Sequence, residues 1–293
     1  MRLSAFTLCG LLALAACSTS PTAIGPIEAL ERAQHQSRVN AEARDYARFT
    51  IARYAELTGD PVTAAQNYAK LMSTVREDAP LEERAVFSSL LINDFDTAAD
   101  KASDIALEDL AEADLTRLTL AVDAIASRNP DSAKPYLNGP WRSPFHAVIA
   151  QSLMAWISAP GDSAAAAAFQ AQAGQDDQVL SAVARSLAGV MLANQGETDA
   201  ALAMFEGLWE EDSRLALAVE VEARLLHQKG ETEKALNRLS RFRSEVGRHP
   251  ALTALKTQIE TDQAGAPRRL TTRQGAALAI YAATAALADQ SNS

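Results

Sequence analysis

Six alanines recur at almost equal intervals along the middle of the chain, and this spacing is the strongest constraint on its fold. Successive members of the set are 33 to 35 residues apart, and each follows a turn-forming stretch such as Gly59-Asp60-Pro61 or Gly196-Glu197. A fixed period of this length is typical of stacked helix-turn-helix units, because one such unit cannot bury its apolar face without neighbours. The six positions are Ala64, Ala98, Ala133, Ala166, Ala201 and Ala235.

The residues between these alanines favour helices. Apolar residues recur at helical spacing from Ile27 onward, whereas runs of the residues that favour strands are nearly absent. The sequence therefore predicts an all-α fold and argues against a β-sandwich or barrel. Because the net charge is −10, a phosphate backbone would repel the chain, and we expect no nucleic-acid partner.

The period and the residues around it resemble the tetratricopeptide repeat (TPR), a helix-turn-helix unit of about 34 residues. The resemblance covers residues 45–250 and is carried by Ala64-Ala65 with Tyr68, and by Leu187-Ala188-Gly189 with Ala201-Leu202 and Phe205. It implies a right-handed superhelical solenoid of about six repeats. Small residues in the first helix of a unit let its two helices approach closely: Ala52, Ala121, Gly189 and Ala223, whereas the second and fourth units have Val86 and Met154 there.

Helical segments flank the repeat region on both sides. Residues 27–44 are expected to form an N-terminal capping helix, and residues 251–293 to form further helices. The last of these, at 271–288, is apolar on several sides. It either caps the solenoid in its groove or leaves a bare face for a partner.

The first residues of the chain are typical of a targeting signal. After Met1-Arg2 comes an apolar stretch to Ala16, which is shorter than the roughly 20 residues that a membrane-spanning helix needs. Its end, Leu14-Ala15-Ala16-Cys17, resembles the lipobox of bacterial lipoprotein precursors. The resemblance implies a signal peptide at 1–16, an acylated Cys17 that anchors the chain to a membrane, and a linker over 17–26. Ser18, where inner-membrane proteins usually have Asp, favours the outer membrane with the body facing the periplasm. The alternative is an ordinary secretory signal with a chance cysteine.

The sequence contains no recognisable catalytic or cofactor motif. Its two cysteines, Cys9 and Cys17, both lie near the N-terminus, and its four histidines show no metal-ligand spacing. Nucleotide-binding and nucleophile motifs are absent as well. We therefore expect no enzyme activity, no cofactor and no metal. A peptidoglycan-acting helical protein with a lone catalytic Glu is the enzymatic alternative.

Two sets of residues are candidates for binding a partner. The TPR resemblance places the first helix of each unit on the concave surface, where outward side chains would grip a peptide: Phe49, Arg53, Glu56, Phe87, Gln151, Glu220, Arg224 and His227. The second set lies in residues 224–273, where eleven Lys and Arg stand against five Asp and Glu. It would dock an acidic protein or anionic headgroups: Arg238, Arg241, Arg243 and Arg248. The alternatives are packing against neighbouring helices for the first set and a solvated face for the second.

These features together favour a non-catalytic envelope lipoprotein that acts as an interaction scaffold or assembly adaptor for another protein or peptide. A regulator of wall enzymes and a structural spacer that binds its own second copy through the terminal helix are the alternatives.

Overall fold

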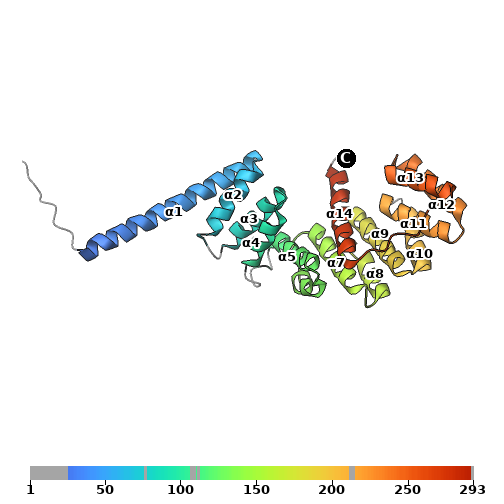
Figure 1. The fold of residues 1–293 in the computed structure, drawn as a ribbon, viewed down its shortest axis with the longest axis horizontal. Coiled ribbons are helices and arrows are strands. Elements are labelled where there is room, and N and C mark those ends of the chain that lie inside the picture. Colours follow the sequence, from blue (N-terminus) through green and yellow to red (C-terminus); the bar gives the residue numbers. More distant parts are fainter. Residues whose placement is uncertain (1–25, 76–77, 106–109, 111–112, 211–214, 292–293) are drawn as a thin grey trace, which may run out of the picture.

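The computed structural model describes residues 26–75, 78–105, 110, 113–210 and 215–291. All regular structure within these residues is helical, which confirms the predicted all-α fold. Figure 1 shows a curved row of helices with α1 projecting from one end as a long rod. None of the helices in the described residues combines the length and the hydropathy that crossing a membrane requires. The predicted signal peptide at 1–16, Cys17 and the linker up to residue 25 lie outside the described residues.

Most of the helices follow one another as antiparallel pairs. The first pairs are α1 (Pro26–Thr58) with α2 (Pro61–Met72), α3 (Ala79–Leu91) with α4 (Phe95–Ser103), and α5 (Asp114–Ala126) with the short helices η2 (Pro130–Ala133) and α6 (Lys134–Leu137). Next come α7 (Pro144–Ser158) with α8 (Ser163–Ala171), α9 (Gln178–Gln195) with α10 (Thr198–Glu210), and α11 (Ala216–Gln228) with α12 (Thr232–Glu245). Two single helices follow, α13 (Pro250–Glu260) and α14 (Thr272–Ser291).

The turns inside the pairs share one geometry. The residue five places before the recurrent alanine has a positive φ in five of the six pairs, at Gly59, Asn93, Arg128, Gly196 and Gly230. The next residue then donates its amide to a carbonyl five positions earlier, as Asp60 does to Ala55. This left-handed ending satisfies carbonyls that the last helical turn leaves without partners. Gly161 in the fourth pair has no positive φ.

The six recurrent alanines are buried, none of them more than 4% exposed. A larger side chain there would push apart the two helices of a pair. The partner position in the first helix is equally tight in the fifth pair, where a Cβ built on Gly189 would lie 2.4 Å from a ring carbon of Phe205. Val86 is also buried, whereas Met154 is half-buried. The alanines therefore set the close approach of paired helices.

Stacking of the pairs produces two faces. Each first helix from α3 onward packs against the second helix of the preceding pair, and the first helices α3, α5, α7, α9, α11 and α13 also contact one another in turn. We name the face formed by the first helices, including the second half of α1, the A-face. The A-face corresponds to the surface on which the sequence predicts partner binding.

The two ends of the row differ from the expected flanking segments. The expected boundary at residue 44/45 is absent, because α1 runs without a break from Pro26 to Thr58. Its residues 26–40 are all exposed, so this part does not cap the array. Neither Gly nor Pro occurs between residues 27 and 58, which gives the helix no signal to stop.

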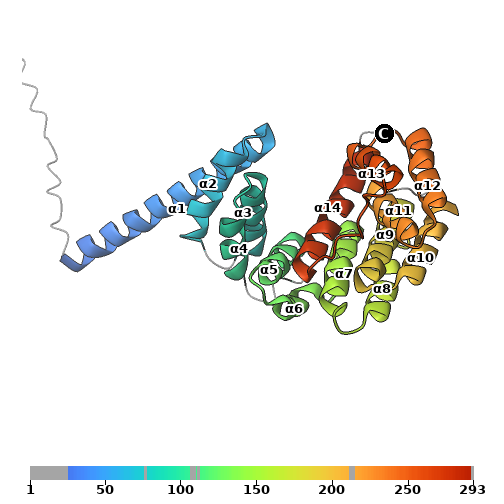
Figure 2. The same cartoon turned by 45° about the vertical axis from the view of Figure 1, so that its right-hand side comes forward.

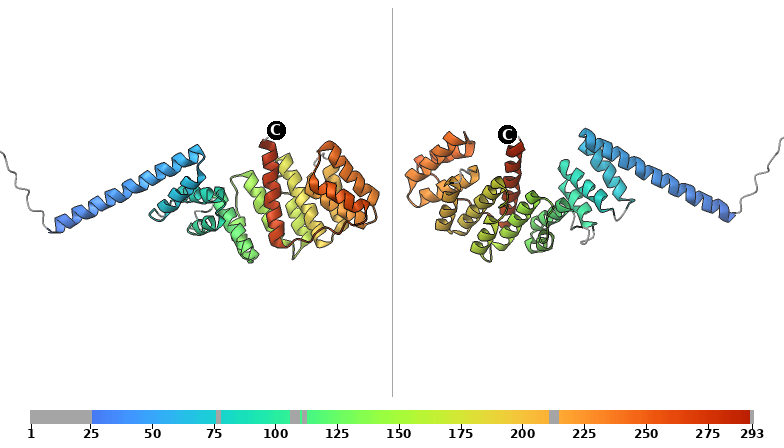
Figure 3. Two further views of the ribbon diagram at one scale, coloured as in Figure 1. Left: turned by 45° about the horizontal axis from the view of Figure 1, so that its top comes forward. Right: turned by 180° about the vertical axis from the view of Figure 1, so that it is seen from behind.

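The terminal helix α14 folds back onto the A-face, where it packs against α5, α7 and α9. Figure 2 shows α14 lying along α7, and both views in Figure 3 place it on one side of the row. Its buried side chains form a small-residue stripe, and a Cβ built on Gly275 would lie 2.2 Å from Trp156. Asn194 fixes the segment before it, since its side chain both donates to and accepts from the backbone of Leu270. Of the two sequence alternatives for this helix, the structure has the capping one. The stripe consists of Gly275, Ala276, Ala279, Ala283 and Ala286.

Candidate protein-binding surface

The path of α14 divides the A-face into three sections. The central section, on α5, α7 and α9, is covered by α14. At the C-terminal end, α11 contacts residues 262–265 of the same chain. The N-terminal section, on α1 and α3, lies beyond α14 and exposes two phenylalanines, Phe49 (39%) and Phe87 (41%). This section is therefore where a partner can reach the A-face.

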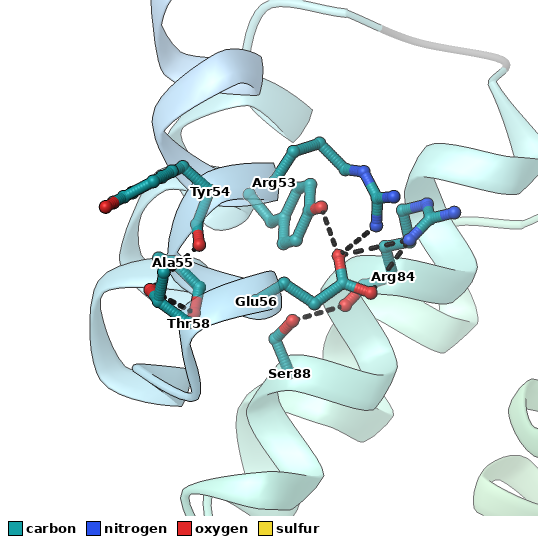
Figure 4. Close-up of polar contacts among 8 residues, drawn as sticks. Arg53, Tyr54, Ala55, Glu56, Thr58, Arg84 and Ser88 are labelled. Atoms are coloured by element: carbon teal, nitrogen blue, oxygen red, sulfur yellow. Dashed lines mark hydrogen bonds and ion pairs between the residues drawn. The ribbon is translucent and has the colours of Figure 1, made fainter.

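A four-residue cluster around Glu56 joins α1, α2 and α3 in this N-terminal section (Figure 4). Tyr68 donates its hydroxyl to Glu56 Oε2 at 2.7 Å, and Arg53 Nη1 donates to the same oxygen at 2.7 Å. From α3, Arg84 Nη1 donates to both carboxylate oxygens, at 2.8 and 3.0 Å. The cluster thereby fixes the first pair against the second.

The charge of this cluster follows from its geometry. Burial alone would raise the pKa of Glu56, but the hydrogen bonds from Tyr68 and Arg53 and the charge of Arg84 together hold that pKa below its usual value. Glu56 is therefore ionised at neutral pH, and the cluster carries one net positive charge. The two arginine side chains remain about one-third exposed, 32% for Arg53 and 39% for Arg84. Their N–H groups can donate hydrogen bonds to a carboxylate of a partner.

A hollow next to the cluster supplies apolar contact surface. It lies between α1 and the facing ends of α2 and α3, and Phe49 and Arg84 both line it. Its walls combine aromatic and aliphatic side chains with one guanidinium and two carboxylates, so its apolar part suits an apolar side chain of a partner, while an acidic group would have to bind at the arginines of the cluster. The other lining residues are Asp45, Tyr46, Leu71, Val75, Asp78, Pro80 and Leu81.

Four of the eight predicted groove residues lie in the N-terminal section of the A-face. Phe49, Arg53, Glu56 and Phe87 all lie on α1 or α3 in the N-terminal section. Arg84 and Tyr68 belong to the same site but are not predicted by the sequence. Tyr68 was visible as part of the repeat pattern, but nothing in the spacing indicates that Arg84 reaches back to the preceding pair.

The remaining four predicted groove residues lie elsewhere on the A-face. Gln151 is half-buried on α7, one of the helices that α14 covers. Arg224 pairs with Glu220 at 3.1 Å and donates to the carbonyl of Gly265 at 3.2 Å. His227 Nε2 lies 3.3 Å from Asp262 Oδ1. Three of the four therefore contact each other or residues 262–265, and they help to hold the chain that leads to α14.

The predicted basic patch is not one exposed surface. Arg238 is only 8% exposed, and it pairs with Glu222 at 3.0 Å and with Glu206 while its guanidinium stacks on Trp209. Arg241 pairs with Glu245 at 3.0 Å. Arg243 and Arg248 are exposed. The prediction of a four-arginine patch is therefore wrong, because the carboxylates that neutralise Arg238 come from α10 and α11.

The buried pair at Arg238 is a structural element. Burial raises the pKa of Glu222, although the hydrogen bond from Trp209 Nε1 at 2.6 Å and the charge of Arg238 act in the opposite direction. Glu206 is nearer the surface, and the hydrogen bond from Arg238 is the main cause that lowers its pKa.

In the part of the chain that the structure describes, no group of three or more His, Cys, Asp and Glu side chains is arranged to hold a metal ion.

Comparison with known proteins adds no family assignment. No protein-family model matches the chain, and a search of curated proteins finds no significant relative. The repeat pattern and the N-terminal section of the A-face are therefore the main indications of function.

Proposed function

We propose that the chain is a TPR-type solenoid of about six repeats that serves as a non-catalytic interaction scaffold. The repeat assignment is supported by the 34-residue spacing, by the burial of all six recurrent alanines and by the shared left-handed turns. These features arise together when like units are stacked, because each unit then needs the same turn and the same close approach.

The proposed binding site is the N-terminal section of the A-face. The observation that carries it is that exposed Phe49 and Phe87 lie on the same two helices, α1 and α3, as the Glu56–Arg53–Arg84 cluster, on the part of the A-face that α14 leaves open. An aromatic anchor beside a partly exposed guanidinium is a common composition of protein-binding hot spots. The partner is a protein segment with an apolar residue and a carboxylate close to it.

A catalytic role for Glu56 has little physical support. A general acid needs a proton at neutral pH, and the neighbours of Glu56 hold its pKa below the ordinary value. Glu222 has a raised pKa but is 1% exposed, so a substrate cannot reach it.

The proposed location is the outer membrane, with Cys17 acylated and the solenoid facing the periplasm. The lipobox-like residues Leu14-Ala15-Ala16-Cys17 support this location. Several acyl chains would anchor the protein durably, because each buried CH₂ contributes about 0.8 kcal/mol. A scaffold held this way would meet partners in the cell envelope.

Site-specific photocrosslinking in intact cells tests the binding site. A crosslinking amino acid at Phe87 should capture a partner, whereas the same group at Phe169 should not. The two phenylalanines are matched, since both are 41% exposed, but Phe169 lies on the second helix α8. Adding Arg53→Ala and Arg84→Ala to the Phe87 variant should abolish the adduct. Equal adducts from both positions, or an adduct that ignores the arginines, would contradict the proposed site.

A further inference from the structure

One face of α1 has an unbroken run of uncharged, exposed residues. At about 100° per residue, the run covers roughly 140° of the helix circumference between residues 33 and 58. The charged residues of this stretch, such as Arg44 and Arg53, lie outside that arc. All twelve members are exposed: Ala33, Gln36, Val39, Asn40, Ala43, Tyr46, Ala47, Thr50, Ile51, Tyr54, Leu57 and Thr58. We name this set the α1 stripe.

Except at Tyr46, which also lines the hollow on the A-face, the α1 stripe is distinct from the two faces of α1 that the fold already uses. The buried side, with Ala52 and Ala55, packs against α2, and the Glu56 side belongs to the A-face. Figure 4 shows Tyr54, a member of the stripe, pointing away from Glu56 and its arginines. The stripe is therefore a third side of the helix.

The position of the stripe in the array explains why it is bare. From α3 to α13, every first helix packs against the second helix of the preceding pair. In the described part of the chain no helix precedes α1, so the corresponding side has no such cover. Stacked repeats normally end in a unit with a polar outer face, because an apolar end would otherwise associate. Tyr46, Tyr54 and Leu57 are instead 75%, 70% and 75% exposed.

We propose that the α1 stripe is a self-association surface, and that its occupant is the α1 stripe of a second copy of this chain. In a two-fold contact the same patch meets itself, so any concentration of one charge would repel its own copy. The stripe contains no charged residue along a length of about 37 Å, at about 1.5 Å per residue. It can thus meet an identical surface without electrostatic cost.

The exposed area is close to what a stable dimer requires. The five large side chains of the stripe, Val39, Tyr46, Ile51, Tyr54 and Leu57, are between 43% and 75% exposed. They offer on the order of 500 Å² per copy, taking ~150–200 Å² for each fully exposed side chain. The seven smaller uncharged residues extend this area toward the roughly 800 Å² per partner of a standard interface. Apart from Tyr46, which also lines the hollow beside the Glu56 cluster, the stripe shares no residue with the proposed A-face site, so this inference does not rest on the proposed function.

Sedimentation velocity on the chain produced from Ser18 onward tests the proposal. This form keeps all described residues and lacks both cysteines. We expect a dimer at micromolar concentration, and we expect Tyr54→Glu with Leu57→Glu to raise the dissociation constant by more than ~100-fold. Tyr281→Glu is the matched control, because Tyr281 is 71% exposed on α14. It should leave the dissociation constant unchanged, and circular dichroism should show equal helix content in all three proteins.

Cysteine crosslinking supplies a second readout that locates the interface. In the same cysteine-free form, Ala47→Cys in the stripe should form an interchain disulfide on mild oxidation, whereas Ala277→Cys on the exposed side of α14 should not. A wild-type monomer over the whole concentration range would overturn the proposal. A dimer that survives both glutamates, or that crosslinks equally through Ala277→Cys, would overturn it as well.

Discussion

Docking of α14 onto the A-face predicts opposite effects for the same substitution at two glycines. Gly275 in α14 lies against Trp156, and a Cβ there would come within 2.2 Å of two ring carbons. Gly207 in α10 is also helical, but a Cβ there would meet nothing within 4 Å. Gly275→Ala should therefore separate α14 from α7, whereas Gly207→Ala should only rigidify its helix.

The expected magnitudes follow from two competing effects. Replacing a helical Gly by Ala stabilises by about 0.5–1 kcal/mol, and this is the whole effect at Gly207. At Gly275 the methyl group is inserted into a closed contact, because Trp156 is 1% exposed and cannot move aside. Overpacking costs about 1–3 kcal/mol, and subtracting the gain of about 0.5–1 kcal/mol leaves a net destabilisation at Gly275 of up to about 2.5 kcal/mol.

Thermal unfolding followed by circular dichroism measures the difference. At roughly 2–4 °C per kcal/mol for a chain of this size, the Tm of Gly275→Ala should fall by up to about 10 °C. The Tm of Gly207→Ala should rise by about 1–4 °C on the same scale. A Gly275→Ala protein as stable as Gly207→Ala would refute the packing of α14 on α7. The central section of the A-face would then be open, and the confinement of binding to α1 and α3 would lose its basis.

Two further predictions concern the ion pairs around α12. Arg238→Leu leaves Glu222 buried without its cation and should lower the free energy of unfolding by about 3–5 kcal/mol, measured by urea unfolding. Arg243→Leu, on the exposed side of α12, is the control and should change that free energy by less than ~0.5 kcal/mol. The pKa of Glu206 is lowered in the folded state, so its contribution is present above the unfolded value of about 4.3 and is lost as the pH falls below it. Glu206→Gln should therefore flatten the loss of stability between about pH 5 and pH 3, and an unchanged slope would exclude Glu206 as a cause.

The turns of this fold were readable in the sequence because few residues tolerate a positive φ. Glycine has no Cβ and asparagine is the next best choice, so Gly59, Asn93, Gly196 and Gly230 indicate helix ends at the correct positions. The buried alanines follow from the same logic, since a period of alanine at a fixed distance from a turn implies a repeated close contact. Local chemistry thus determines the pairs and their boundaries.

Long-range contacts explain what the sequence could not indicate. The basic stretch of the sequence begins at residue 224, but the carboxylates that neutralise Arg238 are Glu222 and Glu206, which lie before it. The return of α14 depends on Gly275 meeting Trp156, more than one hundred residues earlier in the chain. No periodic pattern links such positions. A count of charges over a stretch of sequence therefore overestimates the exposed positive charge when the carboxylates that neutralise it lie before that stretch.

The position of α14 limits the length of a partner segment on the proposed site. Neighbouring helices pack about 8–10 Å apart, so α1 and α3 together with the edge of α5 span roughly 20 Å. An extended chain covers that distance in about six residues at ~3.3 Å each. A longer segment would have to leave the A-face at α14 or displace it. Two copies joined through the α1 stripe would present two such short sites. A partner that carries two segments with an apolar residue near a carboxylate would then bind far more tightly than one site allows, provided that it can span both.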